Sequence, residues 1–200
     1  MKDRRERRDY YYKKAKIEGY RSRAAYKLKE IFKRFKVVKK GFIVIDLGAA
    51  PGGWLQVARE FVGEKGFVLG VDLAPIKPFS WKNVKTMQLD ITSEEAINVI
   101  KESLPKNYAD LVISDLAPKV SGVWSLDHFR QIFLAEKALE IAEKILRPGG
   151  NIVIKVFQGE LLPDFIRKVK KLFRKVKLVK PKASRKHSAE IYVIGLDKLE

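Results

Sequence analysis

One lysine of this 200-residue chain lies where a lysine is difficult to explain by structure alone. Lys155 interrupts the apolar run from Ile152 to Phe157, which has the composition of a strand buried on both faces. Burying an ammonium group costs free energy unless the group is paired or has a function. Burial also lowers the pKa of a lysine amine, which would change its chemistry. Lys155 is therefore the first candidate for a functional residue.

A turn rich in small residues provides a second candidate site. Residues 46–54 read DLGAAPGGW and connect a predicted strand at 42–47 to a predicted helix at 54–62. Small residues allow the backbone to come close to a ligand at the carboxyl end of a parallel sheet. The phosphate-binding spacing Gly-x-Gly-x-x-Gly is absent, which argues against a dinucleotide. Since glycine also serves simply to turn a chain, the segment indicates a ligand site only together with its neighbours.

Two acidic residues end the next two predicted strands. Asp72 closes the strand at 67–72, 20 residues after Gly52, and Asp90 follows the strand at 84–89. An acid at the first position can accept hydrogen bonds from both hydroxyls of a ribose, and one at the second can meet an adenine edge. Either residue could instead cap a helix or form a turn. Their succession at neighbouring strand ends favours a ligand that contains a nucleoside.

The elements that must position these residues alternate between strands and helices. Short apolar runs separated by amphipathic stretches are typical of β/α units around a parallel sheet. We predict one α/β domain over residues 21–200, preceded at residues 1–20 by a basic, mobile arm without a clear apolar period. The predicted strands lie at 42–47, 67–72, 84–89, 109–114, 151–156, 176–179 and 190–196. The first predicted helix begins at Ser22, and the others span 54–62, 93–104, 126–146 and 160–173.

Charge is distributed unevenly along the chain, whose formal net charge is +18. Residues 1–40 contain 17 Lys/Arg against 5 Asp/Glu, and residues 165–187 contain 11 basic residues and no acidic one. The rest of the chain is slightly acidic, so the positive charge belongs to two segments. Such segments favour a polyanionic partner, and we predict a nucleic acid. A solvated charged surface is the alternative, although such surfaces usually mix both signs.

Composition counts against several other classes of protein. The chain has no cysteine, which removes disulfides, thiolate metal sites and thiol nucleophiles. Its two histidines, His128 and His187, lie 59 residues apart without clustered carboxylates, so we predict no metal site. No apolar run is long enough to span a bilayer, and the N-terminus lacks the apolar segment of a signal peptide. We therefore expect a cytoplasmic protein without membrane contact, and a monomer by default.

Further segments accompany the turn at 46–54. Residues 114–118 read SDLAP, residues 147–150 read RPGG, and residues 21–28 read RSRAAYKL before the sheet. Together with the segment from Ser184 to Tyr192, they closely resemble the FtsJ/RrmJ family of S-adenosylmethionine-dependent 2'-O-ribose RNA methyltransferases. The resemblance covers most of the chain from Arg21 onward. It implies a Rossmann-like methyltransferase fold, with a seven-stranded, mostly parallel sheet whose last strand is antiparallel and whose two faces carry helices.

The resemblance also implies which residues act. Its catalytic tetrad falls on Lys27, Asp115, Lys155 and Glu190, and its S-adenosylmethionine site falls on Gly52, Trp54, Asp72, Asp90 and Asp115. Methyl transfer to a ribose hydroxyl needs an oxygen that loses its proton as the new bond forms, and Lys155 is the candidate base. Burial and Lys27 would favour its neutral form, whereas Asp115 and Glu190 would favour its charged form. The sequence leaves that balance open.

The acceptor that the resemblance implies is a uridine of 23S ribosomal RNA within the large ribosomal subunit. There are two alternatives. The protein could methylate transfer RNA, or it could be a non-catalytic RNA-binding ribosome-assembly factor with this fold. Methylation of a pyrimidine carbon commonly needs a cysteine, and the sequence DLAP at 115–118 differs from the Asn/Asp-Pro-Pro-aromatic motif of amine methylation. A small-molecule methyltransferase would leave both basic segments without a role. Trp124 could line the acceptor pocket or belong to the core.

Overall fold

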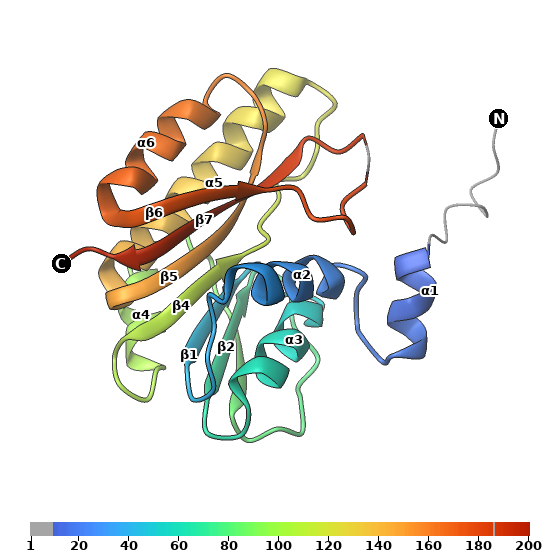
Figure 1. Cartoon of the computed structure of the whole chain (residues 1–200), viewed down its shortest axis with the longest axis vertical. Coiled ribbons are helices and arrows are strands. Elements are labelled where there is room, and N and C mark those ends of the chain that lie inside the picture. The colour runs from blue at the N-terminus through green and yellow to red at the C-terminus, as the bar shows by residue number, and fades with distance from the viewer. Residues whose placement is uncertain (1–9, 186) are drawn as a thin grey trace.

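Seven strands form one sheet in the computed structural model, which describes residues 10–185 and 187–200 (Figure 1). The strands are β1 (Ile43–Leu47), β2 (Phe67–Asp72), β3 (Val84–Gln88), β4 (Ala109–Ser114), β5 (Leu146–Phe157), β6 (Phe173–Val179) and β7 (Glu190–Lys198). Their order across the sheet is β3-β2-β1-β4-β5-β7-β6. All seven predicted strands are present, although β5 and β6 begin earlier than predicted.

The direction of the strands confirms the predicted sheet. The pairs β1–β2, β2–β3, β1–β4 and β4–β5 are parallel, and β7 runs antiparallel to both of its neighbours, β5 and β6. The sheet is therefore mostly parallel with an antiparallel last strand. Because parallel strands place their carboxyl ends on one edge, the segments that follow β1, β2, β3 and β4 meet at that edge.

Helices cover both faces of the sheet, as predicted. Within the described residues they are α1 (Tyr10–Ile17), α2 (Ala25–Phe35), α3 (Gly53–Val62), α4 (Ala96–Glu102), α5 (Trp124–Ile145) and α6 (Leu162–Leu172). Side chains of α2 and α3 join one apolar cluster, and those of α4, α5 and α6 join the other. Alternate residues of β1 divide between the clusters, with Val44 in the first and Ile43 and Ile45 in the second. The sheet is thus the middle layer of three.

The short helix α1 differs from the sequence-based prediction, which makes residues 1–20 a mobile arm. Its residue Ala15 is buried, and its Tyr11 packs on Tyr26 of α2 with ring centroids 5.4 Å apart. Lys14 lies 5.1 Å from the centroid of the same Tyr26 ring. The contacts are aromatic and cation–π contacts between residues that do not form an apolar stripe, which is why periodicity missed the helix. Residues 1–9 of the predicted arm lie outside the described part of the chain.

Candidate active site

The turn after β1 is joined to the segment that precedes α2. Gly52 has a φ of 110°, a conformation that side chains other than glycine rarely adopt. A Cβ atom added to Gly53 would lie 2.3 Å from the Ser22 hydroxyl oxygen, so only glycine allows this approach. The Arg21 guanidinium donates to the carbonyl oxygen of Pro51 at 3.2 Å and lies 3.6 Å from the Phe79 ring centroid. These contacts bring the turn and the start of α2 together.

An acidic cavity of about 280 Å³ lies at the carboxyl edge of the sheet. Three of the predicted site residues, Asp72, Asp90 and Asp115, line it together with backbone from the glycine-rich turn. The remaining lining is largely apolar and comes from Val71, Leu73, Leu89, Ile91, Leu116, Ala117 and Leu134. The structure therefore brings together three acids from the ends of three different strands.

Hydrogen bonds from neighbouring residues orient two of these carboxylates. Asp72 accepts hydrogen bonds from the N–H groups of Ala50 at 2.9 Å and Ala74 at 2.8 Å, one on each oxygen. Asp90 accepts two bonds from Thr92 on the same oxygen, from its hydroxyl at 2.7 Å and from its N–H at 2.9 Å. The Thr92 hydroxyl and N–H lower the pKa of Asp90 below its ordinary value. Both residues thus hold turns and still expose a carboxylate to the cavity.

Gly52 and Trp54 do not line this cavity. Gly52 precedes α3 and faces Arg21 and Phe79, while Trp54 is 3% exposed and lies in the core. The Trp54 indole N–H donates to the Ala24 carbonyl at 2.9 Å, and its ring centroid lies 5.8 Å from that of Tyr192. Trp54 therefore connects the turn to α2 and to β7, and any effect it has on a ligand passes through those contacts.

The four predicted tetrad residues lie side by side although they are far apart in the sequence. Lys27 of α2 donates to Glu190 at 2.8 Å. Lys155 of β5 lies 3.3 Å from a carboxylate oxygen of Asp115 and 3.8 Å from one of Glu190. The Lys155 amine also donates to the Asp115 backbone carbonyl at 2.7 Å, and its side chain is 4% exposed. Two cations and two anions thus form one connected, formally neutral cluster.

Burial and charge act in opposite directions on Glu190. Burial is the largest single influence and raises the pKa of Glu190, but Lys27, Lys155 and a hydrogen bond with Ser188 together outweigh it, so the pKa lies below its ordinary value. Glu190 is therefore held as a carboxylate near neutral pH.

Tyr192 is a neighbour of the tetrad that the sequence analysis did not select. Its hydroxyl donates to Asp115 at 2.7 Å, and burial, with Asp115 and Glu190, raises the pKa of Tyr192 well above its ordinary value. Tyr192 is therefore a neutral donor that orients the Asp115 carboxylate. The signal was present, because Tyr192 follows Glu190 by two residues and so projects from the same face of β7.

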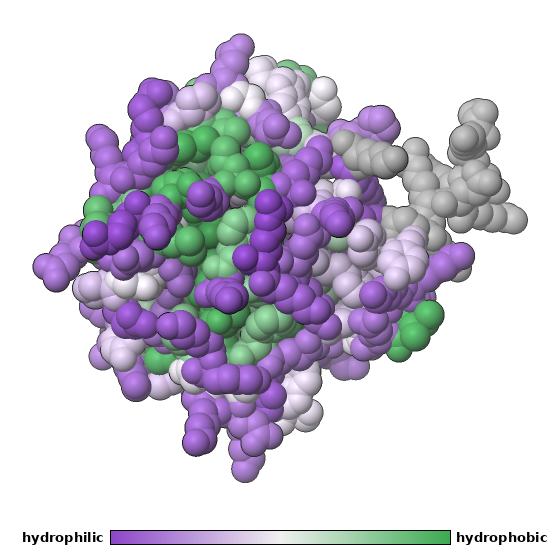
Figure 2. Space-filling view, in the orientation of Figure 1, coloured by the Kyte–Doolittle hydropathy of each residue, from purple (hydrophilic) through white to green (hydrophobic). Residues whose placement is uncertain are grey.

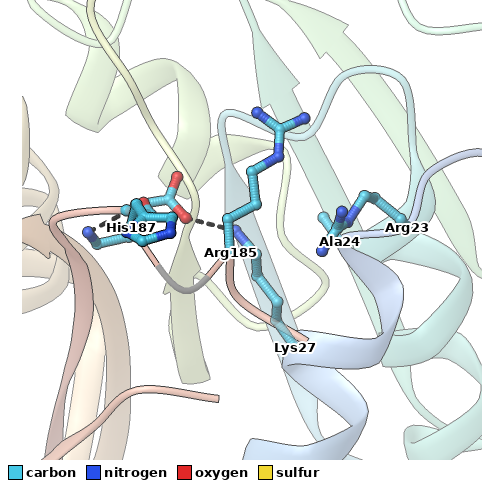
Figure 3. A pocket seen from close by; sticks show the side chains of 7 residues that line it. Arg23, Ala24, Lys27, Arg185 and His187 are labelled. Atoms are coloured by element: carbon cyan, nitrogen blue, oxygen red, sulfur yellow. Dashed lines mark hydrogen bonds and ion pairs between the residues drawn. The ribbon is translucent and has the colours of Figure 1, made fainter. Parts of the chain in front are cut away.

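A second and larger cavity, of about 550 Å³, opens on the other side of the tetrad (Figure 3). Arg23 and Ala24 immediately precede α2, Lys27 lies in its first turn, and Arg185 and His187 come from the β6–β7 connection. Ser188 and Glu190 complete the lining. Figure 2 shows hydrophilic side chains over most of this face of the molecule. The two basic segments of the sequence thus meet at one cavity.

Asp46 is a buried acid that sequence reasoning passed over, although it begins the DLGAAPGGW segment. It is fully buried in β1, and neither carboxylate oxygen has a hydrogen-bond partner within the described part of the chain. Burial, together with Asp115 and Asp72, raises the pKa of Asp46 well above its ordinary value of 3.8. The group therefore stays protonated in the fold at a pH where the unfolded chain ionises.

This protonation predicts a pH-dependent effect of Asp46→Asn. The parent loses stability as pH rises above 3.8 towards the raised pKa, because only the unfolded state releases the proton. Asparagine cannot ionise, so the free energy of unfolding of the variant should rise relative to that of the parent by about 1.4 kcal/mol for each pH unit between 3.8 and the raised pKa. Urea unfolding of both proteins, from about pH 3 to pH 8, measures this difference. Parallel pH profiles would contradict the assignment.

The structure adds two observations on other classes of site. Among residues 10–185 and 187–200, no three His, Cys, Asp or Glu side chains are grouped as a metal site would require. None of the helices in those residues is long and apolar enough to cross a membrane.

The sheet order, the acidic cavity at its carboxyl edge and the Lys–Asp–Lys–Glu cluster beside it define a Rossmann-like methyltransferase. Residues 20–198 match the model of FtsJ-like methyltransferases, and the chain belongs to this family. The protein is thus an enzyme of the transferase class, as the sequence predicted.

Curated relatives resemble the chain over nearly its whole length. It is 53% identical over 191 residues to ribosomal RNA large subunit methyltransferase E of Methanocaldococcus jannaschii, covering 94% of this chain and 78% of that protein. It is 54% identical to the protein of the same name from Methanosarcina acetivorans, covering 96% of this chain and 69% of that protein.

Solved structures show the same architecture. A ribosomal RNA methyltransferase from Plasmodium falciparum is 30% identical and superposes with a TM-score of 0.78, covering 90% of this chain and 99% of that chain. Aeropyrum pernix fibrillarin, solved with bound S-adenosylmethionine, is 17% identical and has a TM-score of 0.63, covering 86% of this chain and 73% of that chain. At that identity the second comparison concerns the fold alone.

Proposed function

We propose that this protein transfers a methyl group from S-adenosylmethionine to a ribose 2'-hydroxyl of RNA, and that the acceptor is a uridine of 23S ribosomal RNA in the large subunit. One observation carries the proposal. The tetrad lies between the two cavities, since Asp115 lines the acidic one, Lys27 and Glu190 line the basic one, and Lys155 contacts both acids. A methyl donor in the first cavity and an RNA strand in the second would meet at Lys155.

The acidic cavity has the chemistry that the donor requires. Asp72 can accept hydrogen bonds from ribose hydroxyls, and Asp90 lies where an adenine edge would be met. Apolar side chains such as Leu89 and Ile91 suit the faces of an adenine ring. Three acids in a chain of net charge +18 also favour a cationic ligand over an anionic one. S-adenosylmethionine, when bound, supplies a methyl group made electrophilic by its positive sulfonium sulfur.

The tetrad has the arrangement that removal of a hydroxyl proton requires. In this proposal Lys155 first releases its ammonium proton to solvent. The amine then accepts the proton of the 2'-hydroxyl as the oxygen bonds to the methyl carbon, and the bond from that carbon to the sulfonium sulfur breaks with its electron pair going to sulfur. The ammonium that forms lies within 3.3 Å of Asp115 and 3.8 Å of Glu190, which stabilise it. Lys27 pairs with Glu190 and so limits the negative charge that faces Lys155 beforehand. Tyr192 holds Asp115 in place through its hydroxyl.

The choice of RNA rests on the basic cavity and on the relatives. Arg23, Arg185 and His187 surround a cavity suited to phosphates, and the curated relatives carry the name of ribosomal RNA large subunit methyltransferases. Transfer RNA is the second candidate because a basic cavity does not distinguish one RNA from another. A monomer and a cytoplasmic location stay predictions.

The proposal is tested with labelled S-adenosylmethionine and purified large ribosomal subunits that lack the modification. After nuclease digestion, label in a 2'-O-methyluridine would support both the reaction and the acceptor. Label on a base would refute the ribose assignment, and label on transfer RNA alone would refute the ribosomal one. Absence of label on every RNA would favour the non-catalytic assembly factor.

Asp72→Ala tests the donor cavity separately from catalysis. The substitution removes a charged acceptor, and we expect the dissociation constant for S-adenosylmethionine to rise roughly 10- to 150-fold. Isothermal titration calorimetry measures the affinity, and Asp164→Ala, an exposed acid on α6, is the matched control. An unchanged affinity in Asp72→Ala would exclude the proposed ribose contact.

A further inference from the structure

Three aromatic rings form a stack beside the tetrad. Trp124, the first residue of α5, lies nearly parallel to His128, with centroids 5.7 Å apart and an interplanar angle of 12°. Trp124 also lies nearly parallel to Phe157, the last residue of β5, at 6.0 Å and 18°. His128 is buried, whereas Trp124 is 52% exposed. The Trp124 ring is thus packed against two other aromatic rings and still accessible to solvent.

The strand register places this stack next to the reacting groups. Phe157 pairs with Glu190, and Lys155 pairs with Tyr192, between antiparallel β5 and β7. Residues two apart on a strand, and residues paired across two strands, project from the same face. Phe157 therefore shares its face with Lys155 and Glu190. Glu190, at one end of this row, lines the basic cavity, and Phe157 contacts Trp124 at the start of α5.

The position of Trp124 is fixed relative to Lys155. Gln131, two turns further along α5, donates to the Lys155 carbonyl at 2.8 Å and accepts from the Phe157 N–H at 3.1 Å. Asp127 accepts hydrogen bonds from Ser121 and Gly122, which holds the loop that leads into α5. The ring is therefore preorganised, and little conformational entropy is lost when a ligand stacks on it.

We propose that Trp124, backed by His128 and Phe157, is a stacking platform for the nucleobase of the acceptor nucleotide. The inference rests on the proposed function, because it assigns the base of the nucleotide whose 2'-hydroxyl reaches Lys155. A nucleotide held there has its phosphates and its base on different sides of the ribose. The basic cavity takes the phosphates on the β7 side, and the aromatic stack takes the base on the α5 side.

The platform positions the base without identifying it. Stacking on an aromatic ring tolerates any base, because every base has a flat π face. Trp124 therefore affects the position of the ribose and not the choice of base. Replacement of the acceptor uridine by cytidine in an RNA substrate should change the rate of methyl transfer little through this contact. An abasic acceptor nucleotide should behave in the parent much as Trp124→Ala does with normal RNA.

The first test compares methyl transfer by Trp124→Ala, Trp124→Phe and Phe129→Ala. Phe129 is a matched control, since it is a 59% exposed aromatic residue on another face of the same helix. We expect kcat/KM for RNA to fall roughly 5- to 150-fold in Trp124→Ala and to stay near the parental value in Phe129→Ala. Trp124→Phe retains a ring and should retain most activity, and S-adenosylmethionine affinity should be unchanged in all three. Equal losses in the two alanine variants, or none, would overturn the proposal.

A second test measures stacking of RNA on Trp124 by fluorescence and does not depend on catalysis. In a Trp81→Phe background the remaining tryptophans are the buried Trp54 and the exposed Trp124. Binding of a short RNA with the acceptor sequence, or of oligouridylate if no methyl acceptor is found, should quench the fluorescence, and Trp124→Ala should abolish the quench. Unchanged fluorescence at RNA saturation, established by anisotropy of labelled RNA, would refute the platform. A quench without methyl transfer to any RNA would instead refute the proposed function alone.

Discussion

Lys155→Met is expected to lower kcat for methyl transfer by about 10²- to 10⁴-fold, the range typical of losing a positioned general base. The reason is that methionine fills a similar volume without an amine that can accept the 2'-hydroxyl proton. Single-turnover transfer of labelled methyl to RNA measures the effect. Because Lys155 does not line the acidic cavity, S-adenosylmethionine affinity should change little, and calorimetry checks this.

Lys155→Arg separates proton transfer from electrostatics. Arginine retains the positive charge beside Asp115 and Glu190, but it cannot be deprotonated in a protein. If Lys155 is the base, the arginine variant should be nearly as inactive as the methionine variant. Near-parental turnover in Lys155→Arg would show that the charge alone is needed, and near-parental turnover in Lys155→Met would end the assignment of Lys155 altogether. Circular dichroism of each variant confirms that the fold is intact.

RNA affinity is expected to fall at least about 10²-fold between 50 and 200 mM salt, because a protein that makes six to ten phosphate contacts loses about 10³- to 10⁵-fold over that range. The physical cause is release of counterions from the RNA when lysine and arginine side chains neutralise its phosphates. Filter binding or anisotropy with unmodified large-subunit RNA, at a series of salt concentrations, gives the slope of the logarithm of affinity against the logarithm of salt concentration. A salt-independent affinity would exclude the two basic segments as the docking surface.

Single substitutions identify which cations contribute to the salt dependence of RNA affinity. Arg185→Ala and Lys182→Ala remove exposed cations of the β6–β7 connection, and each should reduce the slope by about one if it contacts a phosphate. Lys101→Ala, an exposed lysine on α4, should leave the slope unchanged because α4 covers the opposite face of the sheet. Equal changes in all three variants would indicate a diffuse charge effect instead of a docking surface.

Much of the fold was predictable from local patterns. The central strands β1 and β4 are short, mostly apolar runs, which gave nearly the observed bounds because burial on both faces disfavours polar residues, with Asp46 of β1 as an exception. The start of β5 was less predictable. Its first residues, 146–150, include Pro148 and two glycines, which read as a turn, and the register with β4 shifts there. Helix α1 was missed because aromatic and cationic contacts, without an apolar period, hold it on α2.

The residue types of the candidate site could be predicted from the sequence, but only some of their contacts could. Asp72 and Asp90 could be placed at one edge of the sheet, since the ends of parallel strands meet there. Trp54 could not be placed, because a tryptophan after a glycine turn can face a ligand or the core, and here its N–H reaches the Ala24 carbonyl. Asp46 was overlooked because nothing in its local sequence states that its carboxyl is fully buried without a partner.

The sequence by itself determined the alternation of strands and helices, the acids at the strand ends, the lysine within an apolar strand and the two basic segments. Each of these depends on residues that are neighbours along the chain. Only the tertiary structure decided that Lys27, Asp115, Lys155 and Glu190 touch, and that the aromatic stack stands beside them. The physical reason is that β7 inserts between β5 and β6, which aligns Glu190 with Phe157, and periodicity within a strand carries no information about its neighbour.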